Sequence, residues 1–182
     1  FGLKRVLVST YQSISGAGQK GLNQLNAEIN NIEISNPISK YRVANNLIFH
    51  NFDSSNDFTV EEVKMINETR KILGLHKLHI SVTCVRIPVL VGHGESVNLE
   101  LEKEFQINQI KEVLSKQKNL VIKDNPDEDE YPTLQDSEDS DLVFVGRIRL
   151  DKSVQNGLHL WIIANNLRKG AATNTVQIAE LL

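Results

Sequence analysis

The apolar stretch at residues 78–91, LHISVTCVRIPVLV, limits the possible folds more than any other part of the sequence. Alternate side chains of an extended strand point to the same face of a sheet. The alternation here therefore predicts a strand with one buried face, made of Leu78, Ile80, Val82, Cys84 and Arg86. Pro88 cannot donate to a strand ladder, so it predicts a bulge, an edge or the end of the strand. A guanidinium within such a strand needs partners, because burying an unpaired charge costs several kcal/mol.

Similar short apolar runs alternate with helical patterns along the rest of the chain. Further strands are predicted at residues 3–9, 46–50, 96–101, 120–122, 143–150 and 158–165. Helices are predicted at 23–32, 59–73, 108–116 and 167–182. Thr59 and Glu62 have the spacing of a capping box, and Gly74 is a suitable C-terminal stop. The order of these elements is not the repeating βαβ pattern of a nucleotide-binding fold. The pattern predicts an α+β fold with a mixed, largely antiparallel sheet and helices packed on it.

Length and composition narrow the class of protein. The 182 residues suit one domain, 1–182, with 40% hydrophobic and 24% charged residues. Twenty basic and 23 acidic residues give a net charge of −3, which disfavours a general nucleic-acid binder. No apolar run is long enough for a membrane span and no signal peptide opens the chain. The single cysteine excludes an intrachain disulfide and favours a cytoplasmic location. The first residue, Phe1, indicates an excised fragment or a processed chain.

Four ionisable side chains are candidates for chemistry. Arg86 would either form a structural ion pair or clamp a ligand carboxylate with its planar fork. His93, between two glycines, is predicted on an accessible turn past a strand end, as an ordinary loop histidine or as an acid–base residue. Glu61 and Lys64 share a helix face, as a solvated ion pair or as holders of a zwitterionic or phosphorylated ligand.

Three other features give weaker indications of function. The segment 15–18, SGAG, lies before a predicted helix and is a weak signal for anion binding. The stretch 124–141 holds nine acidic residues and no basic one, and is predicted as a long solvated loop without the spacing of a calcium site. Cys84 is expected to be a buried small hydrophobe rather than a nucleophile. No metal site is predicted.

Several of these segments together resemble a known family. They are VSTYQ at 8–12, SGAG at 15–18, CVRIP at 84–88, GHGESV at 92–97, FVGRIR at 144–149 and NNLRKGAA at 165–172. In this order they resemble aspartate-semialdehyde dehydrogenase, and they span almost the whole chain. The resemblance implies a C-terminal domain like that of glyceraldehyde-3-phosphate dehydrogenase, used for substrate binding and for homodimer formation.

The family's activity follows from the resemblance as an expectation. Its members make L-aspartate 4-semialdehyde by NADPH-dependent reductive dephosphorylation of aspartyl phosphate, on the route to lysine, threonine and methionine. The Rossmann half and the nucleophilic cysteine of the family would both precede Phe1, so the isolated chain is expected to be inactive. The segment 167–182 would pack on the missing nucleotide-binding domain.

The resemblance also implies roles for individual residues. Gln12 would orient the acyl group on the absent thiol, and His93 would be the acid–base residue. Arg86 would bind the substrate carboxylate, Glu61 the substrate amino group and Lys64 the phosphate.

The cofactor NADP would be touched by Ser15, Gly16 and Asn166. Two alternatives remain open from the sequence. One is a non-catalytic dimerisation module. The other is a related acyl-phosphate reductase, such as the enzyme that acts on acetylglutamyl phosphate.

Overall fold

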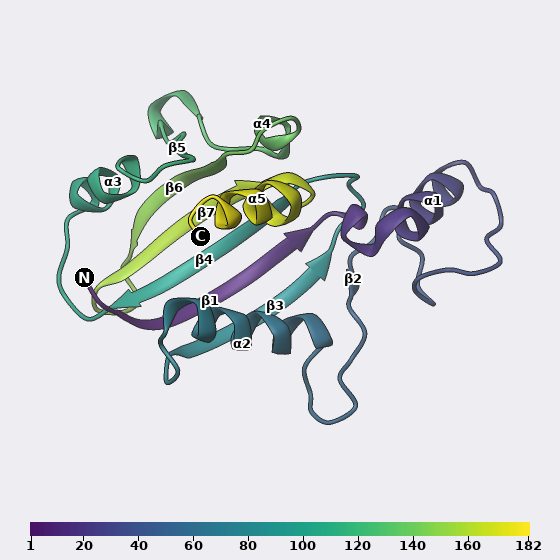
Figure 1. Ribbon diagram of the computed structural model, residues 1–182, viewed down its shortest axis with the longest axis horizontal. Coiled ribbons are helices and arrows are strands. Elements are labelled where there is room, and N and C mark those ends of the chain that lie inside the picture. The colour runs from purple at the N-terminus through teal and green to yellow at the C-terminus, as the bar shows by residue number, and fades with distance from the viewer.

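A mixed sheet of seven strands organises the computed structural model, which describes residues 1–182 (Figure 1). The order of strands across the sheet is β2-β3-β1-β4-β7-β6-β5. Their bounds are Leu3–Gln12 for β1, Ile48–Phe49 for β2, His79–Arg86 for β3, His93–Leu101 for β4, Leu120–Ile122 for β5, Val143–Asp151 for β6 and Gly157–Ala164 for β7. The pairs β1–β3 and β5–β6 are parallel and the other four are antiparallel, which confirms the predicted sheet type.

Five α-helices and three short helical turns connect the strands. The helices are α1 (Gly18–Ile29), α2 (Val60–Leu73), α3 (Ile107–Ser115), α4 (Leu134–Ser137) and α5 (Thr173–Ala179). The turns are η1 (Ile14–Ala17), η2 (Pro126–Glu128) and η3 (Arg168–Ala172). None of the helices combines the length and the apolar character that a membrane span requires.

The main core lies between one face of the sheet and the helices α2 and α3. Because side chains alternate along a strand, Val6 and Val8 of β1 and Val82 and Cys84 of β3 point to this helix face. Met65 and Ile66 of α2 and Ile107 and Ile110 of α3 pack against the same cluster. The opposite face, here called the open face, carries Leu7, Tyr11 and Trp161, and the last two rings lie 5.7 Å apart.

The helix α2 begins and ends where the sequence predicts. The Thr59 hydroxyl accepts a hydrogen bond from the N–H of Glu62, and the Glu62 carboxylate accepts one from the N–H of Thr59. Gly74 ends the helix in the left-handed conformation, with φ of 66°. The second carboxylate oxygen of Glu62 accepts the backbone N–H of Cys84 at 3.0 Å, so this cap also fixes the helix to β3.

Two sequence predictions are wrong near this edge of the sheet: the bounds of the first helix and the exposure of His93. The helix predicted at 23–32 begins at Gly18, directly after the η1 turn, and ends at Ile29. Gly21 allows this close packing, because a Cβ there would lie 2.8 Å from that of Ala17. His93 is not on an accessible turn but is the half-buried first residue of β4. Gly92 makes the turn before it, with φ of 88°.

The acidic stretch 124–141 is largely exposed, as its charge predicts, but it is not an irregular loop throughout. It contains η2 and α4, and Pro132 and Ser137 are fully buried. Two carboxylates are paired with lysines, Asp124 with Lys111 at 2.8 Å and Asp136 with Lys123 at 2.5 Å. The Trp161 indole N–H donates to the Pro132 carbonyl at 2.9 Å, so the segment packs against β7.

The C-terminal segment 167–182 is helical but not one regular helix. The π turn η3 comes first, and α5 follows it. Most side chains of α5 are exposed, including Val176 and Ile178. Asn165 tethers the start of the segment, because its side-chain oxygen accepts the N–H groups of Leu167 and Arg168.

Candidate active site

The predicted site residues meet at the edge of the sheet where β1 and β3 end and β4 begins. Gln12 is the register partner of both Arg86 on β3 and His93 on β4, so these three side chains form one row on the helix face. Figure 1 shows these strand ends together, next to η1 and α1. Every residue in this row is therefore placed by strand pairing rather than by a flexible loop.

A cavity of about 540 Å³ opens above this row. All the residues predicted to carry function line it, namely Gln12, Ser15, Gly16, Glu61, Lys64, Arg86, His93 and Asn166. His50 and Glu95 also line it and were not predicted. The first turn of α2 supplies Glu61 and Lys64, whose charged atoms lie 3.5 Å apart. The four ionisable candidates thus share one site.

Arg86 makes no ion pair within the chain. Its Nη1 donates to the Ser13 carbonyl at 3.0 Å and its Nη2 to the Nδ1 of His50 at 3.2 Å. No carboxylate oxygen lies within 4.0 Å of the guanidinium. Partial burial lowers the pKa of Arg86 from its ordinary value, although Glu61 opposes this shift. The structural ion pair considered from the sequence is therefore absent, and the positive charge faces the cavity without an anionic partner.

His93 is held in one orientation by its backbone surroundings. The backbone N–H of Ser13 donates to its Nδ1 at 3.0 Å, so the neutral ring carries its proton on Nε2. Burial lowers the pKa of His93 from its ordinary value, and the nearby Arg86 charge adds to this. The ring is therefore neutral at pH 7. A Cβ on Gly16 would lie 3.8 Å from the His93 Nε2, so this N–H lies beside Gly16 of the η1 turn.

Asn166 binds the turn that precedes His93. Its Oδ1 accepts the backbone N–H of Gly92 at 2.8 Å and the hydroxyls of Ser13 and Ser15 at 3.1 and 3.3 Å. Its Nδ2 donates to the Ser15 hydroxyl at 3.0 Å. This one side chain therefore joins the end of β7 to the Gly92 turn before β4 and to the two serines at the η1 turn. Asn166 can therefore position His93 as well as line the cavity.

The cysteine is outside the site. Cys84 is fully buried in the core, two positions before Arg86 on β3, and it does not line the cavity. Burial raises the pKa of its thiol to about 11. A thiol that stays protonated and inaccessible cannot act as a nucleophile.

Glu95 lies two positions after His93 on β4, and burial raises the pKa of its carboxyl.

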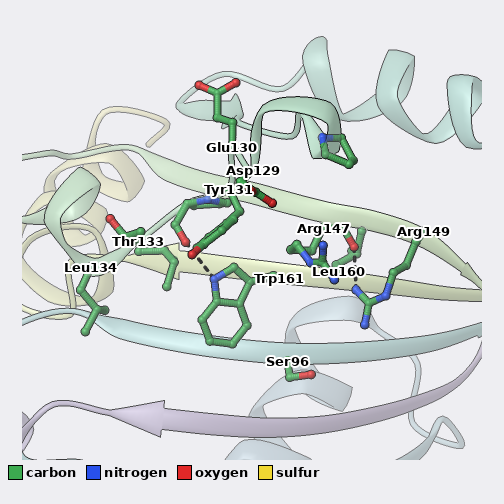
Figure 2. Close-up of a pocket in the computed structure, with 13 residues that line it drawn as sticks. Ser96, Asp129, Glu130, Tyr131, Thr133, Leu134, Arg147, Arg149, Leu160 and Trp161 are labelled. Carbon is green, nitrogen blue, oxygen red and sulfur yellow. Dashed lines mark hydrogen bonds between the residues drawn. The ribbon is translucent and has the colours of Figure 1, made fainter.

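A second cavity, of about 490 Å³, contains none of the predicted site residues (Figure 2). It lies between the segment 129–134 and the strands β6 and β7, and Figure 2 shows the Trp161 indole below that segment. Arg147 and Arg149 line it on a bulge of β6, where Arg147 has φ of 51°. No group of three histidines, cysteines or acidic residues is arranged to hold a metal ion in the structure.

His50 is the main residue of the site that the sequence did not indicate. It follows β2, a strand of only two residues, and its neighbours in the sequence carry no motif. It reaches the site because Ile48 pairs with Arg86 at the edge of the sheet. Glu95 could have been found from its alternation with His93, which places both on one face of β4.

Comparison with known proteins places this geometry in a family. A family model described as the semialdehyde dehydrogenase dimerisation domain matches residues 1–169. An aspartate-semialdehyde dehydrogenase of Aquifex aeolicus is 46% identical over an alignment that covers 100% of this chain and 55% of the relative. For the Bacillus subtilis enzyme of the same name these values are 41%, 100% and 56%. The chain thus spans about half the length of the curated relatives it matches.

Solved structures agree with the sequence relatives. A Vibrio cholerae aspartate semialdehyde dehydrogenase II, complexed with ASA, superposes with a TM-score of 0.90 at 37% identity, covering 99% of this chain and 55% of that one. A Candida albicans aspartate semialdehyde dehydrogenase with NADP has the same fold, with a TM-score of 0.71 at 22% identity. The chain therefore belongs to the semialdehyde dehydrogenase family and corresponds to the dimerisation domain in the C-terminal part of aspartate-semialdehyde dehydrogenases.

Proposed function

We propose that this domain binds the substrate of an enzyme that makes L-aspartate 4-semialdehyde by NADPH-dependent reductive dephosphorylation of aspartyl phosphate. The observation that carries the proposal is the Arg86 guanidinium, which faces the cavity with no anionic partner. Even a half-buried cation without a counter-charge is costly, so a ligand carboxylate is the natural partner. The product would serve the biosynthesis of lysine, threonine and methionine.

The charges of the site match those of this substrate. Arg86 would bind the α-carboxylate, and Glu61 would bind the α-amino group. Lys64, one helical turn from Glu61 and half exposed, would bind the phosphate group, which is more hydrated. This arrangement gives each charged group of a zwitterionic phosphorylated ligand one opposite charge.

His93 would supply the proton chemistry. Because its Nδ1 accepts the Ser13 N–H, its Nε2–H is directed as a donor toward a sulfur or oxygen in the cavity. The lowered pKa keeps the ring neutral, so its Nε2–H would donate a hydrogen bond to a negative atom that forms beside it. Gln12 would orient the acyl carbonyl next to this N–H. The nucleophilic thiol is proposed to lie outside these 182 residues, and for this reason we expect the isolated chain to be inactive.

The walls of the cavity support the proposal that NADP binds beside Ser15, Gly16 and Asn166. Gly18 and Gly170 also line it, and a Cβ on either would meet no atom closer than 3.6 Å. Small residues leave room for a flat ring close to the backbone. The cofactor would supply the hydride, while these residues would only bind and orient it.

Domain arrangement and assembly complete the proposal. Residues 1–182 would form the substrate-binding and dimerisation domain, in a homodimer that uses the open face of the sheet. The segment 167–182 would pack on a nucleotide-binding domain, which its exposed Val176, Ile178 and Leu181 support. A cytoplasmic location, where free thiols stay reduced, belongs to the same proposal.

The full-length protein that carries this chain tests the proposal. With aspartate semialdehyde, phosphate and NADP we expect NADPH to form, and we expect none when phosphate is left out. N-acetylglutamate semialdehyde should be a poor substrate, because its acylated nitrogen carries no charge for Glu61. A preference for the acetylated substrate would overturn the proposal in favour of the related acyl-phosphate reductase. Absence of both activities would leave a dimerisation module.

A further inference from the structure

We propose that His50 is a positioning residue, which holds both the carboxamide of Gln12 and the guanidinium of Arg86 in the orientations that the substrate needs. The inference rests on the proposed function of the site. It assigns a role to a half-buried residue at the short edge strand β2, which no motif of the sequence indicates.

The imidazole of His50 bridges the two side chains directly. Its Nε2 lies 2.5 Å from the Gln12 Oε1, and its Nδ1 lies 3.2 Å from the Arg86 Nη2. The three residues come from β2, β1 and β3, and the pairing of Ile48 with Arg86 brings His50 to the end of this row. His50 is also one of the residues that line the cavity.

The chemistry of the partners determines which nitrogen carries the proton. A guanidinium only donates hydrogen bonds, so the Nδ1 of His50 must be the acceptor. The proton of the neutral ring is then on Nε2 and is donated to the Gln12 oxygen. This turns the Gln12 Nε2 toward the Glu61 carboxylate, which it reaches at 3.5 Å. The donors therefore run in one direction, from Arg86 through His50 and Gln12 to Glu61.

The surroundings keep His50 neutral. Burial lowers its pKa to about 4, and the nearby charge of Arg86 acts in the same direction. Glu61 and Glu62 raise the pKa but do not compensate. A charged imidazole would lose its acceptor for Arg86, so neutrality is required for the bridge.

Without this bridge, the side chains of Gln12 and Arg86 are no longer held in one orientation. Arg86 would keep only its hydrogen bond to the Ser13 carbonyl, and Gln12 would keep only the long contact with Glu61. The carboxamide of Gln12 could then turn over, which would place its oxygen against the Glu61 carboxylate. His50 therefore acts on catalysis through Gln12 and on substrate binding through Arg86.

Three variants of the full-length protein separate these two effects. His50→Asn keeps an acceptor near the position of Nδ1, and His50→Gln keeps a donor near the position of Nε2. We expect His50→Asn to lower kcat about tenfold with nearly unchanged KM for aspartate semialdehyde, and His50→Gln to raise KM about tenfold with nearly unchanged kcat. His50→Ala should show both losses. His76→Asn, in an exposed turn after α2, is the matched control and should change neither constant.

The imidazole proton gives a test that does not depend on turnover. Nitrogen NMR of the full-length protein should show His50 as the Nε2–H tautomer at pH 7, and Arg86→Ala should change its Nδ1 signal. The inference is overturned if the Nδ1–H tautomer is found, if His50→Ala retains both constants within about twofold, or if all three variants lower kcat and raise KM equally. If the wild-type protein has no dehydrogenase activity, the proposed function fails, and the NMR result alone decides the position of His50.

Discussion

At the scale of single residues, the sequence indicates which side chains matter but not how they are partnered. The alternation in β3 places Arg86 on the same face as Cys84, and the structure confirms this. The alternation does not reveal that the partners of Arg86 are a carbonyl and an imidazole, because Ser13 and His50 are 73 and 36 positions away. His93 was expected to be accessible since glycines flank it, yet strand pairing buries it. The partners and the burial of these side chains depend on contacts between strands that are far apart in the sequence, and a single sequence does not show such contacts.

Arg86→Lys distinguishes a carboxylate clamp from a scaffold role. Lysine keeps the charge and most of the stem but loses the planar fork. In the full-length enzyme we expect kcat/KM to fall by roughly 30- to 4,000-fold, equivalent to about 2–5 kcal/mol. The melting temperature should change little. Normal turnover with a clearly lower melting temperature would show that Arg86 supports the fold instead.

Stability should depend on pH through the two half-buried histidines of the site, His50 and His93. The pKa of His50 falls from 6.5 to about 4 on folding, so the unfolded chain binds more protons within this range. The free energy of unfolding should therefore decrease as the pH falls below about 6.5, and His93 adds a change of the same sign. Glu95 opposes it, because burial raises the pKa of its carboxyl.

Urea unfolding at pH 7 and pH 5 measures this dependence. His50→Gln removes one titrating group, so the difference in stability between the two pH values should be smaller in this variant than in the wild type. An equal difference in both proteins would show that His50 does not titrate as the structure implies.

At the scale of elements, helix ends were predictable where a local motif defines them. The capping box at Thr59 and the glycine at Gly74 fix α2 to the residue. The start of α1 at Gly18 was missed because η1 leads into it without a capping side chain. The acidic stretch 124–141 misled for a different reason. Two of its carboxylates, Asp124 and Asp136, are paired with Lys111 and Lys123, and local composition does not show these pairs.

Glu62 should contribute to stability beyond its helix. Its carboxylate is almost fully buried and accepts the N–H groups of both Thr59 and Cys84. Glu62→Ala leaves these two donors unpaired, so we expect a loss of about 2–4 kcal/mol in the free energy of unfolding. Glu68→Ala, at an exposed position of the same helix, should change it by less than about 0.5 kcal/mol. Equal effects of the two substitutions would contradict the bridging role.

At the scale of the whole molecule, the two faces of the sheet serve different purposes. The helix face holds the core and, at one end, the row of candidate active-site residues Gln12, Arg86 and His93. The open face leaves Leu7 and Tyr11 40% and 38% exposed in the middle of a large sheet. The sequence predicted the sheet and its helices, since both follow local periodicity. It did not predict the strand order, because β1 lies between strands that begin 76 and 90 residues after it.

A dimer through the open face can be tested directly. Leu7→Asp places a charge in the proposed interface, so we expect the dimer to dissociate at least tenfold more readily, a cost of about 1.4 kcal/mol or more. Ile72→Asp, on the exposed side of α2 and 79% exposed, should leave the dimer intact. Sedimentation over a range of concentrations measures both. A wild-type chain that stays monomeric throughout would rule out the interface.

The placement of β1 between β3 and β4 also affects how the chain folds. Neither neighbour is close in sequence, and β4 pairs on its other side with β7, which begins 64 residues after β4 does. Sheets built from such distant pairings fold slowly, in roughly milliseconds to seconds, because long loops must close first. Gln12, Arg86 and His93 come into line only when all three strands are in register. We therefore expect local helices to form before the candidate site does, and any affinity for a ligand to appear only when the central strands have paired.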